Sequence, residues 1–166
     1  MPTVLTYSDM ALRILLTAVA SGAFGFDRSV EGQPAGVKTT TLVALAACLA
    51  MLAANWLLDT VGKAPDSFVT FDVMRLPLGV LTGVGFIGGG AILKRDGDVI
   101  GLTTASNLWF VTMIGLSFGA GLFVLGVVGT AVGMAILCGL RVVERRLCSL
   151  SLPRGSNLKC LTALVT

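Results

Sequence analysis

The stretch GVLTGVGFIGGGAILKRDGDVIGLTTASNLW, Gly79 to Trp109, decides between two folds for this chain. It contains GVGFIG, beginning at Gly83, which has the GxGxxG spacing of a dinucleotide-binding loop. Such a loop follows a β-strand, opens a helix and has an acidic residue about 20 residues further on. Here residues 76–82 belong to the same apolar run as the glycines, and Asp96 and Asp98 come too early. The glycines therefore favour a membrane helix over a nucleotide site.

The composition is that of an integral membrane protein. Hydrophobic residues make up 55% of the 166 residues and charged residues only 13%, against about 25% charged in soluble domains. A soluble domain needs more polar side chains to cover its surface. We therefore predict an all-α, polytopic helical membrane protein with glycine-rich helix interfaces and about five transmembrane helices. The five apolar runs are each long enough to cross the hydrocarbon core and lie at residues 10–26, 39–58, 76–93, 102–118 and 121–140.

The basic residues predict the orientation of these helices. With five spans, nine basic residues fall on one side of the membrane and three, Arg13, Lys63 and Arg75, on the other. Cytoplasmic loops carry the excess of Lys and Arg in membrane proteins, so we expect the N-terminus outside and the C-terminus in the cytoplasm. Residues 1–140 form the predicted transmembrane domain. Residues 141–166 form a short basic cytoplasmic tail, whose first arginines are expected to contact anionic headgroups.

The glycines of the third run admit two interpretations. Small residues four positions apart let membrane helices approach closely, and helix packing is the simpler interpretation. The alternative is a broken or flexible third span whose carbonyl groups line a polar path, as in transporters. The glycines concerned are Gly79, Gly83, Gly85, Gly88, Gly89 and Gly90.

Polar residues open the second and fourth runs. Thr103, Thr104 and Asn107 begin the fourth, and we expect Thr103 and Asn107 to share an inward face because an amide in lipid is costly. Thr39 opens the second run beside Lys38. Two helix N-termini with basic residues nearby can hold an anion. Ordinary capping and headgroup contact is the more economical interpretation.

Other kinds of site are not expected from this sequence. It has no histidine, and its four cysteines include no CxxC pair, which argues against a zinc site and against histidine-based catalysis. The acidic residues lie at the ends of the apolar runs, away from the midplane where proton relays and coupling sites place carboxylates. We therefore predict no enzyme, no metal site and no cofactor. The net charge of +3 needs no nucleic acid to explain it.

Several ordered blocks resemble the MgtC/SapB family of membrane proteins over most of residues 10–140. The family pattern is approximately D-x-x-R, G-I-G-F-L-G-A-G and G-L-T-T-A-A-x-x-W, preceded by G-x-E-R and P-A-G-x-R-T. This chain has, in order, GFDR ending at Arg28, PAGVKT ending at Thr39, DVMR ending at Arg75, GVGFIGGG ending at Gly90 and GLTTASNLW ending at Trp109. Asp27 replaces the usual Glu and Lys38 the usual Arg, which keeps the charges but loses the bidentate fork of an arginine.

Together, the motifs and the resemblance select a candidate polar site. We expect Asp27 to pair with a neighbouring loop residue, most plausibly Lys38, at the cytoplasmic mouth. The full candidate set is Asp27, Arg28, Lys38, Thr39, Asp72, Arg75, Thr103, Thr104, Asn107 and Trp109.

The resemblance also implies a role. The family is associated with bacterial adaptation to low Mg²⁺ and with survival inside host cells, and its members are not generally regarded as Mg²⁺ transporters themselves. It implies a non-enzymatic protein of the bacterial inner membrane that acts through another membrane protein or through a second copy of itself. A small ion channel or transporter, with a path along the third and fourth spans, is the alternative. Many family members continue into a cytoplasmic ACT-like domain, for which residues 141–166 are too few.

Overall fold

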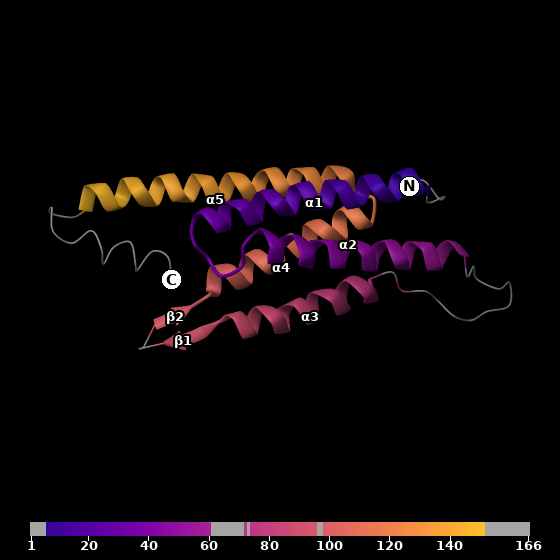
Figure 1. Ribbon diagram of the computed structural model, residues 1–166, viewed down its shortest axis with the longest axis horizontal. Helices are drawn as coiled ribbons and strands as arrows, with labels where there is room; N and C mark the ends of the chain where they lie inside the picture. Colours follow the sequence, from indigo (N-terminus) through magenta and orange to yellow (C-terminus); the bar gives the residue numbers. More distant parts are fainter. Residues whose placement is uncertain (1–5, 61–71, 73, 96–97, 152–166) are drawn as a thin grey trace.

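The computed structural model describes residues 6–60, 72, 74–95 and 98–151, and the described part is a bundle of five helices with one short hairpin. Figure 1 shows α1 and α5 along one edge of the bundle and α3 along the opposite edge, with α2 and α4 between them. The all-α class is confirmed, and each predicted apolar run lies largely within one helix. In chain order the elements are α1 (Tyr7–Val30), α2 (Val37–Thr60), α3 (Arg75–Ala91), β1 (Leu93–Arg95), β2 (Asp98–Ile100), α4 (Leu102–Gly119) and α5 (Phe123–Ser151).

The central helix is α4, which packs against the other four helices. Its second half is almost entirely buried, and Val111, Ile114 and Phe118 share a core with residues of α1 and α2. A Cβ added at Gly115 would collide with the carbonyl oxygen of Ala44, and one at Gly119 would lie 2.7 Å from that of Cys48. Glycines thus let α2 and α4 run side by side in the same direction at close backbone distance.

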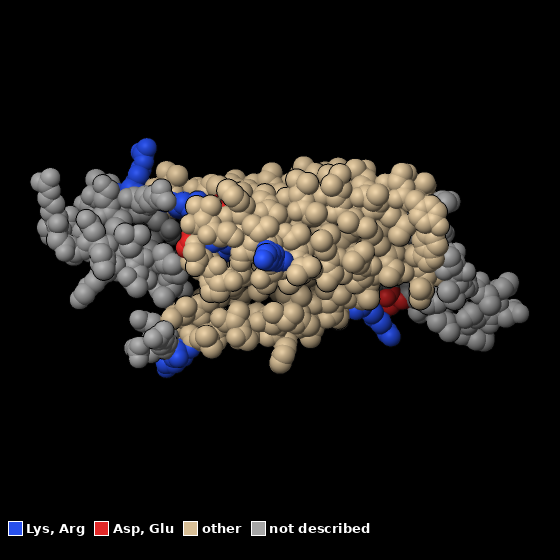
Figure 2. Space-filling model, in the orientation of Figure 1, with Lys and Arg blue, Asp and Glu red and all other residues tan. Residues whose placement is uncertain are grey.

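Three helices, α1, α2 and α5, are long and apolar enough to cross a membrane. The other two, α3 and α4, have 17 and 18 residues and at 1.5 Å per residue are about 26 Å long. Figure 2 shows the charged side chains of one face gathered mainly toward the two ends of the molecule, with mostly uncharged surface between them. Large apolar side chains such as Phe86 are exposed on the outside of the bundle, as expected where lipid replaces water.

Within the described part of the chain, only one of the α3 glycines packs against another helix. A Cβ at Gly88 would contact Ala105 of α4, but Cβ atoms at the other five would meet none of the described residues within 4 Å, namely at Gly79, Gly83, Gly85, Gly89 and Gly90. The prediction of a broken third span was also wrong, because α3 continues through all of these positions to Ala91. Only the face with Val84 and Gly88 is turned to the bundle.

The segment between α3 and α4 contains an antiparallel hairpin. Leu93 pairs with Ile100, and Lys94 with Val99. The hairpin is followed at once by Gly101, whose φ of 92° is left-handed and therefore suits a residue without a Cβ. This tight return places the start of α4 beside the end of α3.

The two ends of the bundle differ in the residues that they hold. We call the end with the starts of α2 and α4 the Arg28 end, and the opposite end the Arg13 end, after a buried arginine at each. The predicted tail is not a separate segment at first, because α5 continues past residue 140 to Ser151. Residues 152–166 of the tail, and Lys63, lie outside the described residues.

Candidate functional site

The C-terminus of α1 presents three charged side chains at the Arg28 end. The helix ends in a Schellman turn, in which Gly32 N donates to Ser29 O and Gln33 N donates to Arg28 O, both at 3.1 Å. Gly32 has a φ of 69°, the left-handed conformation that this turn requires. The turn fixes the last helical residues, so that Asp27, Arg28 and Glu31 project from a rigid helix end.

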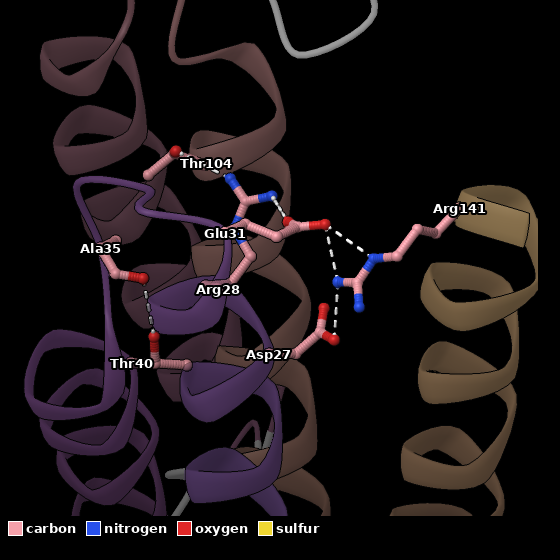
Figure 3. Close-up of polar contacts among 7 residues, drawn as sticks. All are labelled: Asp27, Arg28, Glu31, Ala35, Thr40, Thr104 and Arg141. Carbon is pink, nitrogen blue, oxygen red and sulfur yellow. Dashed lines mark hydrogen bonds and ion pairs between the residues drawn. The ribbon is translucent and has the colours of Figure 1, made fainter. Parts of the chain in front are cut away.

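Arg141 of α5 joins two of these side chains. Its Nη2 lies 2.7 Å from Asp27 Oδ1 and 2.6 Å from Glu31 Oε1, and its Nε donates to the same Glu31 oxygen at 2.8 Å (Figure 3). Arg141 follows the last apolar run directly, and was predicted to contact lipid headgroups. It instead holds α5 against α1, and we call these three residues the clasp.

The position of α5 explains why Arg141 reaches α1. Gly133 lies under the rings of Phe24 and Phe110, so that α5 passes close to α1 and α4. Helices α1 and α5 run in the same direction, since Arg13 near the start of α1 lies over the ring of Phe123 at the start of α5. Their C-terminal halves therefore end together.

Arg28 connects the clasp to α4. Its Nη2 donates to Thr104 Oγ1 at 3.0 Å, and its Nη1 lies 3.6 Å from Glu31 Oε2 (Figure 3). Arg28 and Thr104 are both 3% exposed. The buried guanidinium thus lies at the first turn of α4 and shares the Glu31 carboxylate with Arg141.

The inward face of α4 is displaced by one residue from the predicted one. Thr104 and Asn107 are buried, whereas Thr103 and Trp109 are exposed. The prediction that Asn107 turns inward was right, and the pairing of Thr103 with it was wrong. No side chain caps α4, because its N-cap residue is Gly101.

The predicted pair of Asp27 and Lys38 was wrong. Lys38 and Thr39 are exposed in the first turn of α2, and Asp27 pairs instead with Arg141. The start of α2 is held by Ser29, whose Oγ accepts a hydrogen bond from Val37 N at 3.2 Å. Sequence reasoning missed Arg141 because the contact spans 114 residues of chain. It missed Glu31 although the i, i+3 spacing from the oppositely charged Arg28 was a usable signal.

The remaining candidates lie at the Arg13 end. Asp72 and Arg75 pair with each other, with Arg75 Nε 3.5 Å from Asp72 Oδ2, and both side chains are largely exposed. Asp72 Oδ1 also accepts from Met74 N at 3.0 Å. These contacts order the start of α3 but place both residues at the opposite end of the bundle from Asp27 and Arg28.

A second buried arginine, Arg13, holds the Arg13 end together. Its Nη1 donates to Gly119 O, the C-terminal carbonyl of α4, at 2.8 Å, and its Nη2 pairs with Asp9 Oδ2 at 2.6 Å. Asn55 Nδ2 of α2 donates to the same carbonyl at 3.2 Å. A cation at this end of α4 also complements the helix dipole. Arg13 is therefore structural, whereas the sequence analysis used it only as one of the three basic residues on the outer side.

The chemistry available at the Arg28 end is that of a neutralised ion cluster. Asp27 and Glu31 each contact an arginine, although the second oxygen of Asp27, Oδ2, is buried without a hydrogen-bond partner among the described residues. No group of three or more metal-ligating side chains occurs in the described residues. The arrangement can fix helices relative to one another and can present buried donors.

Comparison with known proteins agrees with this architecture. The profile of the MgtC family matches residues 14–146, which include Arg28 and the clasp and begin one residue after Arg13. The chain belongs to the MgtC family. No solved structure matches it significantly.

The relatives of this MgtC-family chain come from several bacterial groups. The "Putative magnesium transporter YhiD" of Escherichia coli K12 is 35% identical over 136 residues, which are 78% of this chain and 60% of that protein. Protein SrpB of Synechococcus elongatus is 34% identical over 145 residues, 82% of this chain and 77% of SrpB. Protein MgtC of Brucella abortus is 33% identical over 135 residues, 81% of this chain and 52% of that protein. The chain thus spans 60% of YhiD and about half of MgtC.

Proposed function

We propose that this protein is a non-enzymatic membrane component of the bacterial response to scarce Mg²⁺, and that it acts through another membrane protein or a second copy of itself. The names of two relatives, the "Putative magnesium transporter YhiD" and MgtC, support the link to Mg²⁺. The observation that carries the non-transport role is the clasp. Its two carboxylates, the ones buried or half-buried at the Arg28 end, are bound by arginines.

The geometry of the clasp argues against a Mg²⁺ site. Mg²⁺ binds to oxygen ligands at about 2.0–2.1 Å in octahedral geometry and keeps several of its waters. Asp27 is buried, and Glu31 is held by two arginines, so that a hydrated cation would first have to separate these ion pairs. We infer that the cluster fixes the relative positions of α1, α4 and α5, and that a partner protein recognises the surface formed by this arrangement.

Transport of an ion along α3 and α4 is the second candidate, and the name of the YhiD relative favours it. Three hydroxyls on these two helices donate within their own helix at 2.7–2.9 Å, Thr82 Oγ1 to Leu78 O, Ser106 Oγ to Leu102 O and Thr112 Oγ1 to Leu108 O. Each hydroxyl oxygen keeps lone pairs that can coordinate a cation, so a flux assay has to decide between the two candidates.

A growth assay combined with a flux assay tests the proposal. We expect the chain to restore growth in limiting Mg²⁺ to a bacterium that lacks its own MgtC-family protein. The purified protein in liposomes should carry no more Mg²⁺, K⁺ or protons than empty liposomes. Restored growth without flux is the expected result. Flux that exceeds the background would favour the transporter, and absence of any growth effect would reject the link to Mg²⁺.

We also propose that the Arg28 end faces the cytoplasm of the bacterial inner membrane. Lys38, Lys94, Arg141 and Arg146 lie toward this end, and the excess of basic residues is cytoplasmic in membrane proteins. Reporter fusions at Gly32 should therefore give a cytoplasmic signal, and fusions at Pro65 an external one. A cytoplasmic signal at Pro65 would contradict this orientation.

A further inference from the structure

The corner where α1 meets the start of α4 contains hydrogen-bond donors without acceptors in the described part of the protein. Arg28 Nη2 donates to Thr104, but Arg28 Nε is buried and makes no hydrogen bond there. Asn107 Nδ2 is also buried and donates to no described atom. Because a buried donor without an acceptor is unfavourable, these two donors point to an acceptor outside the chain.

Both donors are deeply buried and belong to one corner. Arg28 is 3% exposed and Asn107 6% exposed. Asn107 follows Thr104 by three residues and shares its face of α4, and helical side chains lean toward the N-terminus of their helix. The amide of Asn107 therefore leans toward the contact between Arg28 and Thr104.

The start of α4 adds further donors to this corner. The first backbone N–H groups of a helix have no partner within the helix. The N-cap residue here is Gly101, which has no side chain, and no side-chain cap is formed. The N-terminus of a helix of this length also carries a partial positive charge of about one half. Thr104 Oγ1 accepts from Arg28, which leaves the hydroxyl hydrogen to donate elsewhere.

The charges around the corner leave Arg28 the less well matched of the two arginines. Arg141 lies 2.6–2.8 Å from Asp27 and Glu31, whereas Arg28 forms its ion pair with Glu31 Oε2 at 3.6 Å. Two arginines and two carboxylates balance, and the helix N-terminus adds positive charge. An anion at the start of α4 would meet Arg28 and these amides, while Arg141 binds Asp27 Oδ1 and Glu31 Oε1 and Asp27 Oδ2 stays buried without a hydrogen-bond partner among the described residues.

We propose that the corner formed by Arg28, Thr104, Asn107 and the start of α4 binds a tetrahedral oxyanion of the phosphate type. Its oxygens supply acceptors for guanidinium, amide and hydroxyl donors at once, and its charge matches the arginine and the helix N-terminus. Two sources have this chemistry, namely free inorganic phosphate and the phosphate of an anionic phospholipid headgroup. The biological role of this anion site rests on the proposed function. The site itself is tested separately, by measuring whether an oxyanion binds.

The experiment uses the full chain, purified in a neutral detergent without phosphate. Thermal unfolding is followed while sodium phosphate or sodium sulfate is added, with sodium chloride at equal ionic strength as the control. In a second arm, native mass spectrometry counts the phosphatidylglycerol and phosphatidylcholine molecules that remain bound. Stabilisation by phosphate and sulfate but not chloride identifies the free oxyanion as the ligand. Selective retention of phosphatidylglycerol, without a phosphate effect, identifies the headgroup.

Two variants of one residue test the site itself. Asn107→Leu removes the amide donor, and Asn107→Asp places a negative charge in the corner, which repels the anion. Since a hydrogen bond to a charged group contributes about 1.5–3 kcal/mol, each should weaken binding of the identified probe roughly tenfold or more. Arg75→Ala, at the opposite end, should bind as the wild type does. Comparing two variants keeps the test decisive if one of them fails to fold.

The proposal is overturned if the wild type responds to neither probe, or if a folded Asn107 variant binds as tightly as the wild type. Failure of binding with intact growth in limiting Mg²⁺ would reject the anion site and leave the proposed function standing. Binding as expected without any growth effect would keep the site and reject its assigned role.

Discussion

Replacing Gly115 by leucine should prevent the bundle from folding, or destabilise it by more than about 3 kcal/mol, which exceeds the usual 1–3 kcal/mol of core overpacking. The obstacle is backbone, since a Cβ at this position collides with the carbonyl oxygen of Ala44 in α2. Side chains can change rotamer to make room, but a helix backbone must move as a whole. The folded yield from membranes, and the denaturant midpoint of the protein in detergent, measure the effect.

The matched control is the same substitution at Gly85 of α3. This glycine has no atom within 4 Å of its Cβ position, and leucine has a higher helix propensity than glycine by nearly 1 kcal/mol. Gly85→Leu should therefore leave the folded yield unchanged or raise it slightly. Equal losses in the two variants would mean that α3 packs against something through its glycines after all.

Replacing Arg13 by alanine should give the second large effect, a destabilisation of about 3 kcal/mol, the lower end of the range for breaking a buried ion pair. The substitution removes the donor to Gly119 O and leaves Asp9 without its arginine. It also removes the guanidinium that lies over the ring of Phe123. Denaturant titration of the purified protein in detergent measures the loss.

Arg13→Lys and Arg75→Ala are the controls for this change. Lysine keeps the charge beside Asp9 but not the planar fork, and should recover part of the loss. Arg75 is an exposed arginine at the same end of the bundle, and its removal should have little effect. If Arg13→Ala is as stable as Arg75→Ala, the buried arginine does not hold α1 to the end of α4.

The helices were predictable from the sequence because each apolar run is long and is interrupted by polar residues or turn glycines. The run at 102–118 differs from α4 by one residue at its end, since Gly121, with a φ of 78°, permits the turn that follows. The role of the α3 glycines was not predictable. Spacing alone cannot tell a glycine that faces a neighbouring helix, such as Gly115, from one that faces outward, such as Gly85.

The sequence predicted only those residues of the candidate site that belong to its motifs, and not the contacts between distant helices. The motifs selected Asp27, Arg28, Thr104 and Asn107, which the structure brings to one end. They also selected Asp72 and Arg75, which lie at the other, because a motif records order along the chain and not position in the bundle. Arg141 could not be assigned, since its partners depend on how α5 packs against α1 through Gly133 and Phe24.

The central claim is that the protein functions through the charge cluster at the Arg28 end. Its most direct test is one growth measurement on two isosteric variants. Asp27→Asn and Asp72→Asn each remove one negative charge, at opposite ends of the bundle, and growth in limiting Mg²⁺ is divided by the amount of folded protein in the membrane. Asp27→Asn loses its ion pair with Arg141 and should no longer support growth at equal protein level, whereas Asp72→Asn should support it fully. Full growth with Asp27→Asn, or equal loss with both variants, would contradict the account.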